Sequence, residues 1–135
     1  MMNGAIAETP RLSGLKVLVI DDSKTIRRTA ETLLAKEGCE VFTAVDGFDA
    51  LSKIADHQPD IVFVDIMMPR LDGFGVIEQL RASPETQDLP IIVISAKELT
   101  NEEARKLKES VAFIMKKQGF DGEKLTQEIN NILNF

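Results

Sequence analysis

Residues 61–74 read IVFVDIMMPRLDGF. The first four are apolar without interruption, which is typical of a strand buried on both faces of a parallel sheet. Asp65 stands immediately after them, and Pro69, Asp72 and Gly73 follow at the spacing of a turn. The segment therefore predicts a central buried strand that delivers one carboxylate to the end of a sheet.

Similar apolar runs recur along the chain and alternate with segments whose apolar residues repeat at helical spacing. The expected strands are Lys16–Ile20, Glu40–Thr43, Ile61–Val64, Ile91–Ile94 and Ala112–Met115. Gly38 is placed as the residue that ends the first helix, and Thr100 with Glu103 forms a capping box that begins a later one. Five βα units predict an α/β fold in which helices cover both faces of a parallel sheet.

Length and composition are those of one globular domain, with 135 residues of which 44% are hydrophobic. Residues 1–14 are small and polar, with Pro10 and Gly14 among them, so we expect a flexible tail before a domain spanning residues 15–135. The single cysteine, Cys39, has no partner for a disulfide or a zinc site. We expect it to be a small buried hydrophobe.

The charge of the chain restricts its partners. A net charge of −6 argues against a nucleic-acid surface, which needs clustered lysine and arginine. No apolar run approaches the roughly 18 residues of a membrane span, so we expect no membrane insertion. The start of the chain also lacks the pattern of a secretory leader, and we therefore expect a cytoplasmic protein.

Polar residues that could take part in catalysis or ligand binding follow four of the five expected strands. Ligands of open α/β sheets bind beyond the carboxyl ends of the strands, where these residues should meet. They are Asp21, Asp22 and Ser23 after the first strand, Asp65 after the third, Ser95 after the fourth, and Lys116 and Lys117 after the fifth. Each alone has an ordinary explanation, as a helix start, a loop residue or a solvated charge. The order Asp-Asp, Asp, Ser, Lys at these positions would be rare by chance.

Three carboxylates at one edge repel each other and need a cation or protons to compensate them. Because no histidine or cysteine accompanies them, oxygen ligation favours Mg²⁺ over zinc or copper. Phosphoryl transfer asks a protein mainly for positioning and for neutralisation of charge. A carboxylate nucleophile, a metal, a lysine and a serine hydroxyl supply these, so the set predicts a site of phosphoryl transfer.

At these residues the sequence resembles the receiver domains of response regulators. The resemblance covers about residues 15–133 and rests on VLVIDDSKTIRR, residues 17–28, and IVFVDIMMPRLDGF. The first half is similar to stand-alone receivers of chemotaxis-like systems for type IV pili and twitching motility. From about Gly75 onward the chain looks more like receivers attached to hybrid kinases. The resemblance implies a flavodoxin-like, doubly wound three-layer (βα)5 sandwich with strand order 2-1-3-4-5.

The resemblance also implies roles for individual residues. Asp65 would be the phospho-acceptor, and Mg²⁺ would be held by Asp65, Asp22 and the carbonyl of Met67, with Asp21 acting partly through a metal-bound water. Ser95 and the lysine after the fifth strand would contact the phosphoryl group. These roles imply a phosphoprotein of a two-component system, with a histidine kinase or phosphotransfer protein as donor and a separate effector protein as output.

The fifth strand departs from the family pattern because no proline follows its lysine. Spacing to the last helix, and similarity to receivers that carry Lys-Gly there, favour Lys117. The aromatic residue that usually stands three positions before the lysine would instead pair Phe113 with Lys116. We expect Lys117. The aromatic switch is then either Phe113, the residue Ile114 if this register holds, or absent.

The sequence therefore predicts a phospho-acceptor signalling domain that acts only on its own phosphorylation state and is not otherwise an enzyme. One alternative is a degenerate receiver that serves only as a binding module, and another is a phosphohydrolase with an aspartyl nucleophile. A flavodoxin-like cofactor binder is disfavoured, because Asp21 and Asp22 in the first loop would repel a phosphate.

Overall fold

Parallel strands and helices alternate along the chain in the computed structural model, which describes residues 12–68, 70–96, 98–117 and 122–133. The strands are β1 (Lys16–Ile20), β2 (Glu40–Ala44), β3 (Ile61–Asp65), β4 (Ile91–Ser95) and β5 (Phe113–Lys116). The helices are α2 (Lys24–Lys36), α3 (Gly47–His57), α4 (Gly73–Ala82), α5 (Asn101–Lys108) and α6 (Gly122–Leu133). The predicted order of strands is confirmed, because the sheet runs β2-β1-β3-β4-β5 with every pair parallel.

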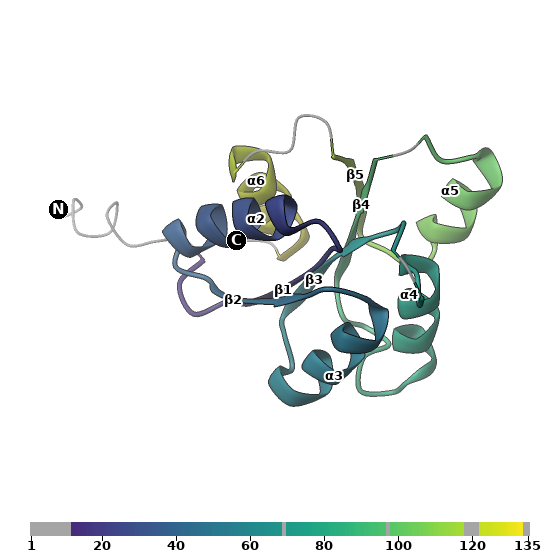
Figure 1. The fold of residues 1–135 in the computed structure, drawn as a ribbon, viewed down its shortest axis with the longest axis horizontal. Coiled ribbons are helices and arrows are strands. Elements are labelled where there is room, and N and C mark those ends of the chain that lie inside the picture. Colours follow the sequence, from purple (N-terminus) through teal and green to yellow (C-terminus); the bar gives the residue numbers. More distant parts are fainter. Residues whose placement is uncertain (1–11, 69, 97, 118–121, 134–135) are drawn as a thin grey trace, which may run out of the picture.

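The sheet is the middle of three layers, with α2 and α6 on one side and α3 and α4 on the other (Figure 1). Alternate residues of the strands supply the two cores, as the two-residue period of a strand requires. On β1, Val17 and Val19 belong to the core beneath α2 and α6, whereas Leu18 and Ile20 belong to the core beneath α3, α4 and α5. The central strands β1, β3 and β4 are apolar at all but one end residue because both of their faces are buried.

Polar side chains begin four of the helices by accepting hydrogen bonds from backbone N–H groups of the first turn. The caps are Ser23 for α2, Asp46 for α3, Asp72 for α4 and Thr100 for α5. The predicted capping box of Thr100 and Glu103 is confirmed, as is the position of Gly38 just after the end of α2, with φ +89°. Among the described residues, no helix is both long enough and apolar enough to cross a membrane.

The start of the packed domain and the bounds of four strands differ from the sequence-based expectations, and one of these is the end of β2 at Ala44 instead of Thr43. Leu12 was assigned to a tail ending at residue 14, but it is 1% exposed and its N–H donates to the carbonyl of Glu37 at 3.2 Å. The packed part of the chain therefore includes residues 12–14, because one apolar side chain there reaches the core under α2. Residues 1–11 lie outside the described residues.

The other differences concern strand ends. The fifth strand runs from Phe113 to Lys116, one residue later than expected. Asp65 and Ser95, expected just beyond their strands, are the last residues of β3 and β4. A continuous apolar run marks a buried strand well but carries no alternation that would fix its ends.

Candidate functional site

The three aspartates singled out in the sequence meet at the carboxyl edge of the sheet. Asp21 and Asp22 directly follow β1, and Asp65 ends the neighbouring β3, where Ile20 is paired with Val64. One carboxylate oxygen from each lies within 4.8 Å of the other two. Asp21 and Asp65 are buried, whereas Asp22 is exposed, so the cluster is open to solvent on the side of Asp22.

Lys117 is the cation of this site. Its Nζ lies 3.1 Å from Asp21 Oδ2 and 3.2 Å from Asp65 Oδ2. Its backbone N–H donates to the carbonyl of Ser95 at 2.9 Å, which ties it to the end of β4. Lys116 points elsewhere and pairs with Glu98 at 2.7 Å, with both side chains largely exposed. Of the two candidate lysines, the structure brings Lys117 to the acids and leaves Lys116 outside.

Burial of Asp65 is only partly compensated by its neighbours. The N–H of Met67 donates to Asp65 Oδ1 at 3.1 Å, and Lys117 adds its charge. Burial, together with the nearby charge of Asp21, outweighs these effects and raises the pKa of Asp65 to about 6. A carboxyl group with this pKa is mostly ionised at pH 7, so it remains a competent nucleophile.

The pKa of Lys117 is raised as well, which for a lysine favours the charged form. Its partial burial disfavours the ammonium, but the charges and hydrogen bonds of Asp21 and Asp65 prevail and raise the pKa of Lys117 above its ordinary value. The lysine therefore stays charged across the physiological range. It compensates one of the two buried carboxylates and leaves the cluster acidic.

The residues fit a hard divalent cation. Asp21 Oδ1 accepts the N–H of Ser23 at 2.8 Å, but Asp21 Oδ2 is buried and accepts no hydrogen bond from the described residues, although it lies beside the Lys117 ammonium. Such an atom is costly unless a cation compensates it. The donors are all oxygens, which suits Mg²⁺ better than a soft metal.

Ser95 and Met67 occupy the edges of this cluster. Ser95 is 2% exposed and stands opposite Lys116 in the pairing of β4 with β5, one strand away from Asp65. Met67 lies in the loop between β3 and α4, and its side chain is exposed while its N–H faces Asp65. Both predicted residues thus lie at the same edge as the acids.

Asp46 and Arg70, which were not among the predicted site residues, form an ion pair between the loop after β2 and the loop after β3. Asp46 is buried, and the hydrogen bond from the N–H of Asp49 lowers its pKa despite that burial, with further help from Arg70. Asp46 follows the end of a strand as the other acids do, so its position was the available clue. The charge of Arg70 gave none, because a turn arginine is usually solvated.

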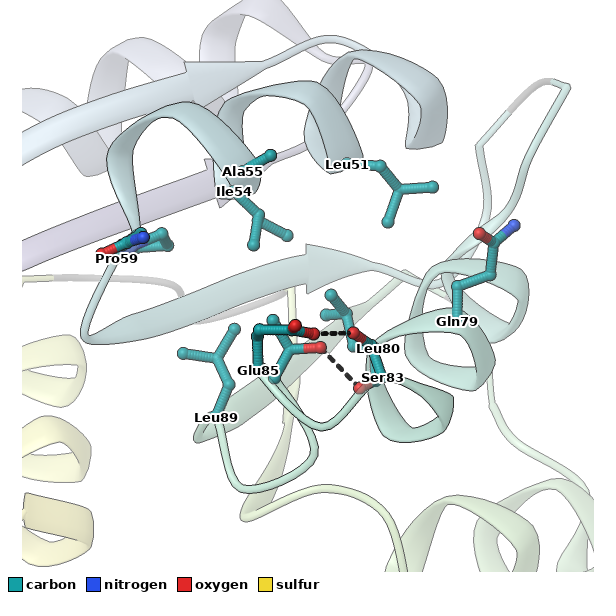
Figure 2. Close-up of a pocket in the computed structure, with 11 residues that line it drawn as sticks. Leu51, Ile54, Ala55, Pro59, Gln79, Leu80, Ser83, Glu85 and Leu89 are labelled. Atoms are coloured by element: carbon teal, nitrogen blue, oxygen red, sulfur yellow. Dashed lines mark hydrogen bonds between the residues drawn. The ribbon is translucent and has the colours of Figure 1, made fainter.

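Two depressions help to locate the chemistry. A hollow of about 450 Å³ adjoins the acids and is lined by Asp22, Ile66, Met67, Met68, Asp72, Phe74 and Glu103. A larger groove of about 600 Å³ lies between α3 and α4, where apolar side chains such as Leu51, Ile54 and Leu89 face one another (Figure 2). Its lining includes Pro59, which precedes β3 and so lies at the opposite end of that strand from Asp65. In the same lining, the hydroxyl of Ser83 donates a hydrogen bond to Glu85 at 2.5 Å. The acids, and not the larger groove, are therefore the candidate site.

Comparisons with known proteins agree with this choice. Residues 17–130 match the family model described as response regulator receiver domain. Over 85 residues the chain is 62% identical to protein PilG of Pseudomonas aeruginosa, and the matched region covers 63% of each protein. Over 81 residues it is 47% identical to the probable transcriptional regulator ycf27 of Cyanophora paradoxa. That matched region covers 60% of this chain and 33% of the other protein. The matched part is thus less than two thirds of either relative.

Solved structures give the same answer. The chemotaxis response regulator CheY4 of Vibrio cholerae superposes with a TM-score of 0.81 at 29% identity, covering 89% of this chain and 99% of that one. A putative response regulator from Chloroflexus aurantiacus superposes with a TM-score of 0.82 at 27% identity, covering 91% and 100%. The likeness extends over almost the whole described chain.

Proposed function

Since the chain belongs to the response regulator receiver domain family, we propose that Asp65 accepts a phosphoryl group from a phosphohistidine on a kinase or phosphotransfer protein. The observation that carries this proposal is the position of Asp65, a buried carboxylate beside Lys117 and two further acids at an edge open to solvent. Receiver domains are signalling domains, so this is a switch that turns over its own phosphoryl group.

Mg²⁺ would be held by Asp21, Asp22, Asp65 and the carbonyl of Met67. When bound, the ion supplies positive charge that offsets the oxygens of a transferring phosphoryl group. The support for this assignment is the cluster of three carboxylates and the buried Asp21 oxygen that accepts no hydrogen bond. Asp22 is exposed, so the cluster is open to solvent on that side, and a phosphoryl donor would approach from there.

In the transfer step, a carboxylate oxygen of Asp65 forms a bond to phosphorus while the bond from phosphorus to the donor nitrogen breaks. The electron pair of that bond stays on the departing imidazole, and Asp65 becomes an acyl phosphate. The ammonium of Lys117, 3.2 Å from Asp65, would then contact a phosphoryl oxygen. The hydroxyl of Ser95 would donate to another.

We further propose that phosphorylation changes which partner the domain binds. Recruitment of Ser95 and Lys117 would pull on the ends of β4 and β5, because the N–H of Lys117 is bonded to the carbonyl of Ser95. With Lys117 at the site, the position three residues earlier is Ile114, a half-buried aliphatic residue of the core under α5. The switch would thus repack an isoleucine and not rotate an aromatic ring.

The partners we propose are a cytoplasmic histidine kinase or phosphotransfer protein and a separate effector protein. The similarity to protein PilG and to the chemotaxis regulator CheY4 supports a place in a chemotaxis-like or pilus motility pathway. The similarity to PilG covers the first part of the chain only, so it bears on the acidic loops more than on the surface of the last helices.

The direct test incubates the protein with Mg²⁺ and a small acyl phosphate and then measures intact mass. Wild type should gain one phosphoryl group that is labile in base, and Asp65→Asn should gain none. Lys117→Ala should slow the gain, while Lys116→Ala, a matched variant one residue away, should not. A wild type that never gains mass would point to a receiver that serves only for binding, and steady release of inorganic phosphate from small phosphoesters would point to a hydrolase.

A further inference from the structure

The loop between β3 and α4 carries Met67 and is fixed at both of its ends. The N–H of Ile66 donates to the carbonyl of Ile94 at 3.2 Å, which continues the sheet for one residue. At the other end, the N–H of Gly73 donates to the carbonyl of Ile66 at 3.2 Å. These backbone hydrogen bonds hold the two ends of the loop, and side-chain contacts of Arg70 and Leu71 hold the part between them.

An ion pair provides the first contact to the middle of the loop. The guanidinium of Arg70 donates to Asp46 Oδ2, while Asp46 Oδ1 accepts the N–H of Asp49 at 2.8 Å and begins α3. The Asp46 side chain is 6% exposed and that of Arg70 is 68% exposed. The buried carboxylate is therefore the fixed partner, and Arg70 reaches to it from the loop.

A close fit of Leu71 provides the second contact. A Cβ atom at Gly47 would lie 2.4 Å from the carbonyl oxygen of Leu71, and a Cβ atom at Gly75 would lie 2.5 Å from its Cδ1. Leu71 thus lies between two glycines, one at the start of α3 and one in α4. At Gly47 the contact is with the backbone, so α3 could not approach the loop so closely with a larger residue there.

The same stretch of chain also contacts the acidic loop after β1. The carbonyl of Ala44 accepts the N–H of Asp21 at 3.1 Å, and Asp46 follows two residues later. The end of β2 together with the loop after it therefore contacts both loops that contribute acids to the site, through Ala44 and Asp46. It forms a bridge between Asp21 on one side and the Met67 loop on the other.

The backbone at Arg70 indicates that this contact serves more than stability. Its φ of +66° is a left-handed conformation, which is unfavourable for a side chain other than glycine. An ion pair with one well-exposed partner contributes little stability. The contact therefore offers little net stability, and its main consequence is where the loop is held.

Resting on the proposed function, we propose that Arg70 and Asp46 are positioning residues for the metal site. Together with Leu71 between its two glycines, they form a clamp that holds the Met67 carbonyl where Mg²⁺ binds. The clamp acts on affinity for Mg²⁺ and leaves the chemistry at Asp65 to the residues already described. Removal of either charged partner should weaken Mg²⁺ binding by roughly three- to tenfold, at or below the usual effect of residues that orient metal ligands.

The experiment compares Arg70→Asn and Asp46→Asn by calorimetric titration with Mg²⁺. Asparagine tolerates the left-handed backbone of Arg70 and retains helix capping at Asp46, so both variants keep the local backbone. Simple electrostatics predicts opposite signs, because loss of a cation near the site should tighten Mg²⁺ binding and loss of an anion should weaken it. The clamp predicts that both variants weaken binding and that the double variant is no weaker than either single one.

Two further measurements separate positioning from general damage. Urea unfolding followed by circular dichroism should show little loss of stability for Arg70→Asn, and Lys116→Gln, which removes another exposed ion pair, should bind Mg²⁺ as wild type does. Phosphorylation by a small acyl phosphate should recover in the variants at saturating Mg²⁺. Tighter binding by Arg70→Asn, unchanged binding by both variants, or additive losses in the double variant would overturn the clamp. If wild type itself bound no Mg²⁺, the proposed function would fail instead.

Discussion

The substitution Asp65→Asn should stabilise the metal-free protein at neutral pH. Asp65 is 1% exposed and shares its surroundings with Asp21, and these two effects raise its pKa from 3.8 to about 6. Between pH 4 and 6 the folded protein keeps a proton that the unfolded chain has released. The stability contributed by this group is therefore fully present below pH 4 and is lost as the pH rises through about 6.

The size of the effect follows from the raised pKa. At 1.36 kcal/mol per pKa unit, the ceiling is about 3 kcal/mol. The carboxyl group lies at an open edge and Lys117 stands beside it, so solvent screening reduces the expected value to about 1–2 kcal/mol. An amide avoids the ionisation entirely. The free energy of unfolding of Asp65→Asn should thus exceed that of wild type by about 1–2 kcal/mol at pH 7.5, and by close to zero at about pH 3, below the pKa of the unfolded chain.

The assay is urea unfolding in the presence of a chelator, followed by circular dichroism because the chain contains no Trp or Tyr. Asp22→Asn is the matched control, since the Asp22 side chain is exposed and should gain less. Addition of Mg²⁺ should stabilise wild type by mass action and narrow its gap to Asp65→Asn. A difference in the free energy of unfolding that does not depend on pH would refute the raised pKa of Asp65. So would an Asp65→Asn protein that is less stable than wild type at pH 7.5.

Three other outcomes can be measured on the same protein. Lys117→Met leaves two buried carboxylates without their cation and should cost about 2–4 kcal/mol in metal-free urea unfolding at pH 7.5, whereas Lys116→Met should cost less than about 0.5 kcal/mol. Gly47→Ala places a Cβ atom 2.4 Å from the backbone oxygen of Leu71 and should cost about 1–3 kcal/mol, with an unaltered melting temperature as the contrary result. Burial raises the pKa of Cys39 to about 11, so a thiol reagent at pH 8 should label the folded protein slowly and the urea-unfolded protein quickly.

The fold could be predicted because each central strand is recognisable in the sequence as a run of apolar residues. β1, β3 and β4 each contain four consecutive apolar residues, since both faces of these strands are covered by helices. Each run stops at its first polar residues, and at a carboxyl end those residues are the ones a ligand meets. The positions of Asp21, Asp22 and Asp65 follow from this rule without knowledge of any contact.

Contacts between loops could not be predicted in the same way. The pairing of Asp46 with Arg70 joins residues 24 positions apart, and neither stands in a pattern that names its partner. The burial of Leu12 is a similar case, because one leucine outside any periodic segment gives no indication of the surface that it covers. Such contacts depend on how closely the loops approach, which here is set by Gly47 against Leu71.

The ambiguity between Lys116 and Lys117 has a structural cause in the position of β5 at the edge of the sheet. An edge strand is only partly covered, so Phe113 and Ile114 are half-buried and a lysine can stand within the strand itself. The first polar residue is then no longer the first residue beyond the strand. Alternation decides the outcome, because Met115 is buried, Lys116 points to solvent, and the bond from the N–H of Lys117 to Ser95 carries the strand geometry one residue further. Lys117 therefore turns inward to the acids, at the position that its spacing to the last helix had favoured.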